Sequence, residues 1–320
     1  MDREFVEPEF ATNLARAASR YWKFSSFEFV RWFENAVFRV TIEGQTGYLR
    51  ITPSVRRSAV QIACELNILV FLHSKDFGAT YPIATQQGDS FVQLQHGENY
   101  YFVCVLAECI GTDFMFEPPK DIFQFHFNCG AKMAELHQLL RQVQKTFKID
   151  RFDWTNDRWS RFNELVPSKE HAAWKTYEEM KAWWPTLSRN LEKQLIHGDF
   201  TVKNLRYTGV NIHLFDFDGC CEHWIGYEIA CFLHYFRQKR SDSGKQIVQK
   251  FLEGYSSISA ISDSLLESIP QFGKMKLLRS YIVLIEEWGL SNLPPEKELV
   301  LESRRRELET AEGWRYAIGA

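Results

Sequence analysis

The chain has 320 residues, enough for one large domain or for two lobes of ordinary size. Hydrophobic residues make up 45% and charged residues 25%, so a packed core is expected and a disordered chain is not. The net charge of -3 argues against nucleic acid as a partner, because nucleic-acid binding calls for a basic face. The seven cysteines form no C-x-x-C pair, which favours reduced thiols in the cytoplasm over a disulfide framework or a zinc site.

Two features bear on membrane targeting. Residues 1–10 are acidic and lack the basic-then-apolar order of a signal peptide. The longest apolar run, residues 66–72, is far too short to span a bilayer. We therefore expect a cytoplasmic protein with no membrane partner.

The first hundred residues predict a small lobe rich in β-structure. Its strands are recognised by β-branched and aromatic residues, and its main helix by apolar residues that recur at helical spacing. In chain order the expected elements are a helix at 11–23, strands at 37–42 and 48–51 joined by a turn at 43–47, a helix at 57–73, and strands at 91–94 and 101–106.

After Gly111 the pattern becomes mainly helical. The expected elements are a long helix at 123–143, a helical stretch with irregular joins at 151–190, a hairpin of strands at 205–207 and 210–217, further helices from 226, and a last helix that opens at 294–295. The sequence thus predicts an α+β fold of two lobes, a small β-rich lobe at 1–106 and a larger helical lobe at 107–320.

Residues 197–199 (His-Gly-Asp) begin a pattern that suits phosphoryl transfer from ATP. Such transfer needs one carboxylate that orients the acceptor hydroxyl and takes its proton, and hard oxygen ligands that hold Mg²⁺ against the phosphates. Asp199 is followed by four residues and Asn204, and the predicted hairpin then delivers Asp216 on the next strand. Because the tight turn at 208–209 brings the ends of the hairpin together, Asn204 and Asp216 are expected to share one metal.

The alternative for this segment is a loop in which the Asp and Asn side chains only make turn hydrogen bonds. The pattern H-G-D-x-x-x-x-N is expected by chance in on the order of one in a thousand chains of this length. A following strand that ends in a carboxylate pair lowers the odds further. We therefore favour the catalytic interpretation.

Residues 197–219 resemble the corresponding segment of the aminoglycoside phosphotransferase, choline kinase and type II homoserine kinase family, whose members have a protein-kinase-like fold. The resemblance extends over most of the chain and is sharpest in this segment. It implies Asp199 as the catalytic base, with Asn204 and Asp216 as magnesium ligands. It also implies His197 as a support for the loop.

Lys203 stands where family members commonly carry a small residue, just after a position that is commonly Pro and is Val202 here. Two interpretations of this lysine stay open. It is either a solvated surface side chain or a catalytic cation that offsets charge beside the transferred phosphoryl group.

ATP also needs a cation near its α- and β-phosphates, which kinases place on a strand of the small lobe and hold with a Glu on the next helix. The candidates here are Arg50 and Glu65, and residues 48–51 resemble the returning strand of the family, where many members have Lys. Arginine stays charged and grips two oxygens at once, so it is a plausible substitute. The alternative for Arg50 is an exposed strand arginine.

The remaining nucleotide contacts follow from the resemblance alone. Residues 33–36 take the place of the phosphate loop, which makes Asn35 a candidate contact although the segment has no glycine. The adenine is expected at the junction of the lobes, against the backbone from Ala107 to Cys109.

Two further positions have expected support roles. His137, in the predicted long helix, is expected to be a hydrogen-bonded histidine near the core rather than a ligand. Glu228 stands where the family usually has an Asp that braces the catalytic loop. It is one methylene longer than Asp, which leaves the bracing open.

Together these features predict a phosphotransferase dependent on ATP and Mg²⁺ that acts on a hydroxyl of a small molecule. Acceptors like aminoglycosides, amino-acid alcohols or choline all stay open. One alternative is a catalytically weak or inactive nucleotide-binding protein on the same fold, which the missing glycines and Arg50 favour. A protein kinase is a further alternative, but no A-P-E-like segment follows Asp216.

Overall fold

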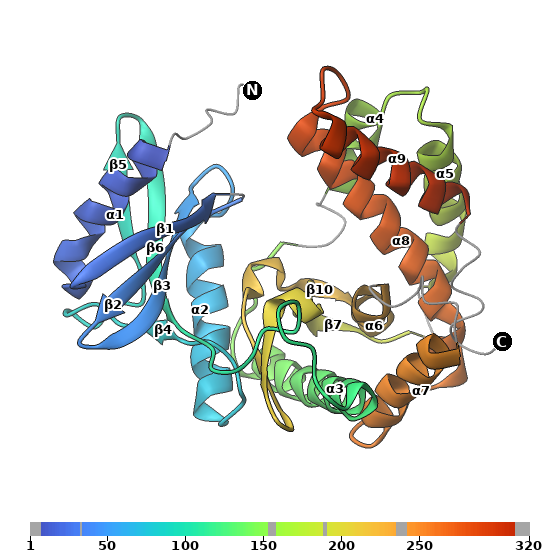
Figure 1. Cartoon of the computed structure of the whole chain (residues 1–320), viewed down its shortest axis with the longest axis horizontal. Coiled ribbons are helices and arrows are strands. Elements are labelled where there is room, and N and C mark those ends of the chain that lie inside the picture. The colour runs from blue at the N-terminus through green and yellow to red at the C-terminus, as the bar shows by residue number, and fades with distance from the viewer. Residues whose placement is uncertain (1–7, 33, 153–157, 188–190, 235–241, 311–320) are drawn as a thin grey trace. The chain divides into compact units, whose positions relative to one another are not determined.

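The computed structural model describes residues 8–32, 34–152, 158–187, 191–234 and 242–310, and it divides into two units (Figure 1). The first unit contains residues 1–111 together with 148–151 and 213–215, and the second contains the rest of the chain. The first unit is built on a sheet and the second is mainly helical. The predicted α+β fold, with a small β-rich part followed by a larger helical part, is confirmed.

The described part of the first unit contains one six-stranded antiparallel sheet and two helices. The strands pair in the order β1-β2-β3-β6-β4, and β5 also pairs with β6. The elements are α1 (Pro8–Trp22), β1 (Ser26–Trp32), β2 (Ala36–Ile42), β3 (Gln45–Pro53), α2 (Ala59–Ser74), β4 (Pro82–Ile83), β5 (Val92–His96) and β6 (Asn99–Ala107). Strand β1 was missing from the sequence prediction. It is an edge strand with mostly exposed side chains, so its sequence lacks the alternation of a half-buried strand.

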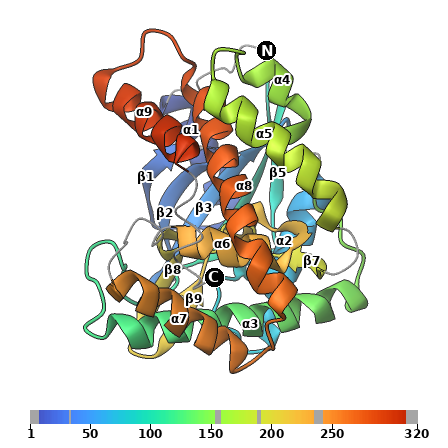
Figure 2. The same ribbon diagram turned by 90° about the vertical axis from the view of Figure 1, so that its right-hand side faces the viewer.

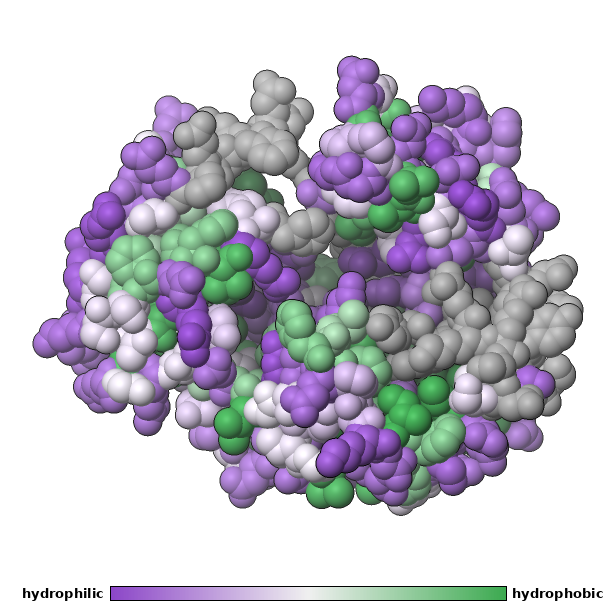
Figure 3. All heavy atoms as spheres, in the orientation of Figure 1, coloured by the Kyte–Doolittle hydropathy of each residue, from purple (hydrophilic) through white to green (hydrophobic). Residues whose placement is uncertain are grey.

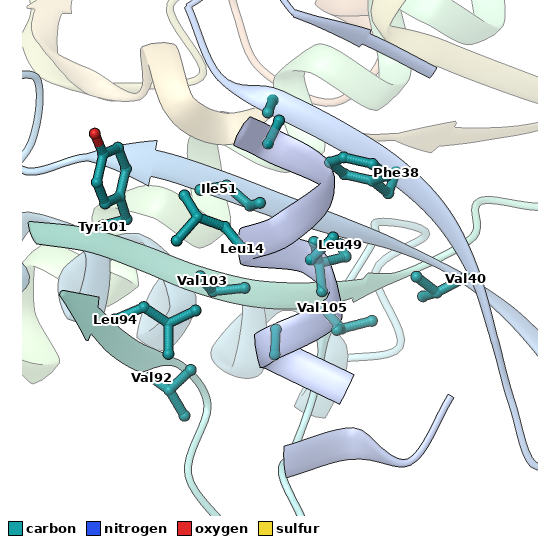
Figure 4. Packing of buried hydrophobic residues seen from close by; sticks show 14 of the residues in the cluster. Leu14, Phe38, Val40, Leu49, Ile51, Val92, Leu94, Tyr101, Val103 and Val105 are labelled. Atoms are coloured by element: carbon teal, nitrogen blue, oxygen red, sulfur yellow. The ribbon is translucent and has the colours of Figure 1, made fainter. Parts of the chain in front are cut away.

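The two helices cover opposite faces of this sheet. Leu49 and Ile51 of β3 point to the face that α1 covers, where they form a buried core with Leu14 (Figure 4). Because side chains alternate along a strand, Arg50 points to the other face. Its partner there is Glu65 of α2, so the hydrophobic core and the buried ion pair lie on different sides of one strand.

The described part of the second unit consists of helices around short strands. Its helices are α3 (Ile122–Thr146), α4 (Phe162–Leu165), α5 (His171–Trp183), α6 (Ile225–His234), α7 (Asp242–Ser256), α8 (Asp263–Trp288) and α9 (Pro295–Glu309). Helices α3 and α7 lie side by side (Figure 2). A Cβ on Gly130 of α3 would lie 1.9 Å from the carbonyl oxygen of Phe251, and one on Gly254 of α7 would lie 1.9 Å from that of Phe127. Only glycine permits this approach of the two backbones.

Two pairs of short strands frame the segment that carries the predicted chemistry. Strand β7 (Lys193–Ile196) pairs with β10 (Cys221–Trp224), and β8 (Leu205–Thr208) pairs with β9 (Asn211–Leu214). The pair of β7 and β10 was not predicted, because each strand has only four residues. Ile196, the last residue of β7, lies opposite Cys221, the first of β10. The loop after β7 therefore begins next to the point where the loop before β10 ends.

The prediction that Asp216 lies on a strand is wrong. Strand β9 ends at Leu214, and Asp216 has φ 66° and ψ 56°, a left-handed conformation that cannot continue a strand. Asp216 instead precedes the 3-10 turn η5 (Phe217–Gly219). This places its carboxylate at the start of the loop that enters β10.

On the face that Figure 3 shows, hydrophilic residues are interspersed with small hydrophobic groups. None of the helices in the described part of the chain combines the length and the apolar character needed to cross a bilayer.

Candidate active site

Asp199 lies in the loop between β7 and β8, and its side chain is 46% exposed. Its nearest predicted partner, Asn204, ends the 3-10 turn η4 (Val202–Asn204) and is buried. The Nδ2 of Asn204 donates to Asp199 Oδ2 at 2.8 Å and to the Asp199 backbone oxygen at 3.0 Å. Because the amide nitrogen faces Asp199, the amide oxygen of Asn204 is turned away from it and is available as a hard ligand.

A third side chain, not predicted from the sequence, completes this group. Lys276 of α8 donates from Nζ to Asp199 Oδ1 at 3.0 Å, and its side chain is only 13% exposed. The two carboxylate oxygens of Asp199 thus have different partners, an ammonium on Oδ1 and an amide on Oδ2. This arrangement fixes the plane of the carboxylate.

The charges around this pair favour its ionised form. Burial raises the pKa of Asp199, but the charges of Lys276, His197 and Arg279 outweigh burial, so this pKa lies below its ordinary value. Burial likewise lowers the pKa of Lys276, and the facing Asp199 carboxylate more than reverses that effect. At neutral pH the structure therefore holds a carboxylate against an ammonium.

Glu228 of α6 holds the loop that carries Asp199, and the Glu228 side chain is fully buried. Glu228 accepts hydrogen bonds from the backbone N–H of His197 at 3.0 Å and of Gly198 at 2.6 Å. His137 Nε2 donates to the same carboxylate at 2.9 Å, and His137 Nδ1 lies 2.8 Å from the Tyr255 hydroxyl. The longer glutamate therefore does brace the loop, and His137 is the hydrogen-bonded core histidine that the sequence predicted.

We expect Glu228→Gln to lower the free energy of unfolding by about 1–3 kcal/mol, because an amide nitrogen would replace one of the carboxylate oxygens that accept from the His197 and Gly198 backbone and from His137. The activity should fall with it, since the loop loses its brace. Urea unfolding of the variant measures the effect. Glu222→Gln is the matched control, because Glu222 of β10 is exposed and its ion pair with Lys193 should contribute less than about 1 kcal/mol. Equal losses in the two variants would contradict the bracing role.

The loop of Asp199 and the loop of Asp216 meet at their backbones. Gly198 has φ 81°, and a Cβ there would lie 2.1 Å from the carbonyl oxygen of Gly219. Any other residue would both strain the backbone and push the two loops apart. Asp218, between Asp216 and Gly219, is buried. Asp199 and Asp216 are 17 positions apart in the sequence. The contact at Gly198 explains how the fold brings their two loops into one region.

The donor chemistry of this region suits a hard cation. A carboxylate from Asp216 and an amide oxygen from Asn204 are ligands that Mg²⁺ prefers. Among the residues that the structure describes, no three His, Cys, Asp or Glu side chains lie close enough to hold a metal by themselves. A bound Mg²⁺ would therefore take further oxygens from water and from the phosphates of a nucleotide, as is usual for this ion.

In the first unit, Arg50 and Glu65 contact each other as the sequence predicted. Arg50 Nη1 donates to Glu65 Oε1 at 2.7 Å, and Nη2 donates to Oε2 at 3.0 Å. The Arg50 side chain is 5% exposed and that of Glu65 is 0% exposed. The alternative of an exposed strand arginine is therefore wrong. That the pair binds a nucleotide remains a prediction.

The other predicted nucleotide residues lie in the first unit. Asn35 lies between β1 and β2 and accepts a hydrogen bond from Arg56 Nη1 at 3.3 Å, whereas Phe33 lies outside the described residues. The backbone N–H of Ala107 donates to the Tyr81 oxygen at 2.8 Å. Cys109 is half-buried, and its Sγ donates to the Leu214 oxygen at 3.2 Å. An adenine contact along residues 107–109 stays a prediction.

Lys203 lies on η4 between two buried residues, Val202 and Asn204, and its own side chain is exposed. The structure thus shows two lysines with different surroundings, Lys203 in solvent and Lys276 against Asp199. In the sequence Lys276 stands out only as a charged residue between two apolar ones, Met275 and Leu277, which are both buried. Nothing in the sequence near Asp199 points to it.

The chain has a β-rich unit followed by a helical one. It carries the braced Asp–Asn loop, the Asp216 turn and a buried arginine–glutamate pair. These features define the protein-kinase-like class of phosphotransferases. The family model described as "Phosphotransferase enzyme family" matches residues 27–261. This is well over half of the chain, and the chain belongs to this family. The prediction of a kinase-type phosphotransferase with an alcohol group as acceptor is confirmed.

Similar proteins share both the length and the fold of this chain. Amicoumacin kinase of Bacillus subtilis (strain 168) is 22% identical over 311 residues, which cover 92% of this chain and 91% of that protein. A solved structure of amicoumacin kinase hAmiN in complex with AMP-PNP, Ca²⁺ and Ami matches with a TM-score of 0.83 and 21% identity, over 94% of this chain and 93% of that one. The structure of a microcompartment-associated aminopropanol kinase matches with a TM-score of 0.76 and 19% identity, over 96% and 98%. These likenesses confirm the protein-kinase-like fold.

Proposed function

We propose that this protein transfers the γ-phosphoryl group of ATP, with Mg²⁺, to a hydroxyl of a small molecule in the cytoplasm. The observation that carries the proposal is the Asp199 carboxylate held by Asn204 and Lys276 on a loop braced by Glu228. Phosphoryl transfer depends mostly on positioning and on charge stabilisation, and this arrangement provides both.

Asp199 is the proposed catalytic base. Its carboxylate accepts a hydrogen bond from the acceptor hydroxyl, points the oxygen at the γ-phosphorus, and receives the proton as the new P–O bond forms. Asn204 and Asp216 would hold Mg²⁺, which when bound neutralises charge on the β- and γ-phosphate oxygens. The buried Asn204 amide makes two hydrogen bonds to Asp199. These bonds fix a proposed metal ligand against the proposed base.

Lys276 is the proposed cation beside the transferred group. Its ammonium lies 3.0 Å from Asp199 Oδ1, next to the proposed base, and we assign it to the oxygens of the transferred phosphoryl group, which carry the negative charge. Lys203 stays a second candidate for this role, since it neighbours Asn204 in the sequence. The exposure of Lys203 gives it more freedom to move than Lys276 has.

Arg50 is the proposed contact for the α- and β-phosphates, oriented by Glu65. A guanidinium held by two parallel hydrogen bonds keeps a fixed plane, which suits recognition of phosphate oxygens. Asn35 and the backbone of residues 107–109 remain the proposed contacts for the phosphate loop and the adenine.

The relatives guide the choice of acceptor. Amicoumacin kinases align over more than nine-tenths of the chain, and an aminopropanol kinase does so as well. We therefore place amicoumacin-like antibiotics and small amino alcohols first among the candidate acceptors, ahead of aminoglycosides and choline.

A catalytically inactive nucleotide-binding protein is the second candidate, because segment 33–36 lacks glycine and Arg50 replaces the usual Lys. Against it, Asp199, Asn204 and Asp216 are all present. Carboxylates placed close together repel one another, and an inactive protein has no function that would require this destabilising arrangement.

A screen of acceptors tests the proposal. The protein with ATP and Mg²⁺ should release ADP when amicoumacin, 1-amino-2-propanol or another hydroxylated compound is added, and only slowly without an acceptor. Binding of ATP without ADP release for any acceptor, and without slow hydrolysis, would favour the inactive protein instead.

A further inference from the structure

A second arginine shares the buried glutamate of the proposed nucleotide clamp. Residues 148–151 follow α3, a helix of the second unit, yet they group with the first unit. The backbone N–H of Asp150 lies 3.4 Å from Cys64 Sγ, and Arg151 Nη1 donates to the backbone oxygen of Gln61 at 2.9 Å. Both contacts are to α2, so this short segment is attached along that helix.

Arg151 also reaches Glu65. Its Nη1 lies 3.6 Å from Glu65 Oε2, and neither side chain has any exposed area. Gln61 and Glu65 are four residues apart on α2 and therefore lie on the same face of the helix. The guanidinium of Arg151 bridges the two. At 3.6 Å its contact with Glu65 is an ion pair rather than a hydrogen bond, whereas Arg50 takes both carboxylate oxygens at 2.7 and 3.0 Å.

Burial strengthens the contacts of this cluster. The side chains of Arg50, Glu65 and Arg151 are almost fully buried, so water screens their charges much less than it does at a surface. An ion pair at this depth therefore restricts the position of Glu65 more than a surface pair would.

We propose that Arg151 is a positioning residue of the nucleotide clamp: it holds Glu65 in place, and Glu65 in turn holds the Arg50 guanidinium that is the proposed contact for the phosphates. The inference rests on the proposed function, since it presupposes that Arg50 faces a nucleotide. Arg151 acts through Glu65 and is not itself placed against the reacting atoms. The same contacts hold residues 150 and 151 against α2, so the position of Glu65 is fixed within the first unit.

The binding of nucleotides that differ in charge tests this role. We expect Arg151→Met to weaken the binding of AMP-PNP with Mg²⁺ by about tenfold, while the binding of adenosine changes by less than about twofold. Isothermal titration calorimetry measures both. Lys148→Met is the matched control, because it removes an exposed cation from the same segment and should change AMP-PNP binding by less than about twofold.

Arg151→Lys is the variant that keeps a cation beside Glu65. It should bind AMP-PNP within about threefold of the wild type and so recover most of the loss. Undiminished AMP-PNP binding in Arg151→Met, or an equal loss of AMP-PNP and adenosine binding, would overturn the inference. Where Arg151→Met unfolds below the assay temperature, Arg151→Gln takes its place, with the same expected loss and the same overturning result.

The wild type distinguishes failure of this inference from failure of the proposed function. Wild-type protein that binds neither AMP-PNP nor ATP with Mg²⁺ overturns the proposed function, and the role of Arg151 with it. Wild-type protein that binds AMP-PNP no more tightly than Arg151→Met does leaves the proposed function standing and overturns only the role of Arg151.

Discussion

Asp199→Asn should lower kcat for phosphoryl transfer by about 10²–10⁴-fold, the range that a positioned general base contributes. The amide keeps the size of the carboxylate and an acceptor oxygen, but it cannot take the proton of the acceptor hydroxyl. The Kd for ATP with Mg²⁺ should change little, because the proposed phosphate contact, Arg50, belongs to the other unit. Steady-state kinetics and calorimetry measure the two quantities separately.

A matched control for this variant is Asp89→Asn, which makes the same chemical change at an exposed turn of the first unit. It should leave kcat unchanged. Asp199→Asn with full activity would show that Asp199 is not the base, and loss of ATP binding along with activity would point to a folding defect instead. Unfolding curves of the two variants distinguish these outcomes.

Lys276→Met should lower kcat by about 10²–10³-fold, the loss typical of removing one group that stabilises charge in the transition state. The ammonium fixes Oδ1 of Asp199 and is the proposed cation beside the transferred group, so its loss should both free the carboxylate and remove a cation. Lys276→Arg should recover part of the activity, because it retains the charge. The KM for ATP should change little if the role is confined to the transfer step.

Two other lysines serve as comparisons for Lys276. Lys274 is on the same helix and pairs with Glu179 at 3.2 Å, so Lys274→Met removes an ordinary surface ion pair. Lys203→Met tests the second candidate cation directly. If Lys203→Met lowers kcat and Lys276→Met does not, the roles assigned to the two lysines are reversed.

The stability of Lys276→Met should behave differently from its activity. Methionine has a similar length and an apolar side chain that can stay buried, and Asp199 is 46% exposed, so water can solvate its carboxylate. We therefore expect a free energy of unfolding equal to that of the wild type within about 1 kcal/mol, or higher. Such a result would identify a buried charge that serves catalysis rather than folding.

The elements that sequence patterns predicted are those with a strong local period. The helices α2 and α3 and the strands β2, β3, β5 and β6 bury one face or both, so their apolar residues recur regularly. Strand β1 was missed because it is exposed on an edge, and β7 and β10 were missed because four residues hold too little pattern. The strand predicted at 210–217 was too long, because the left-handed backbone of Asp216 leaves no mark in a run of aromatic and apolar residues.

The contacts of the candidate site divide in the same way. Those between residues close together in the sequence were predicted, and those between residues far apart were not. Asp199 and Asn204 were predicted as a group because a single short turn joins them, and their hydrogen bond follows from that turn. Arg50 and Glu65 are 15 residues apart, on the adjacent strand and helix of a known arrangement. Lys276 is 77 residues from Asp199, and Arg151 is 90 residues from Gln61. Pairs so far apart are set by how helices and chain ends pack, which no local pattern encodes.

The central claim is that a hydroxyl attacks the γ-phosphate under the direction of Asp199, and detection of the product by ³¹P nuclear magnetic resonance tests it most directly. Wild-type protein, ATP, Mg²⁺ and an acceptor found by the screen should give a new phosphate monoester signal that grows together with ADP. Asp199→Asn at the same protein concentration should form the monoester at least about a hundredfold more slowly. Formation of inorganic phosphate and ADP without any monoester, or an equal monoester signal from Asp199→Asn, would contradict the account.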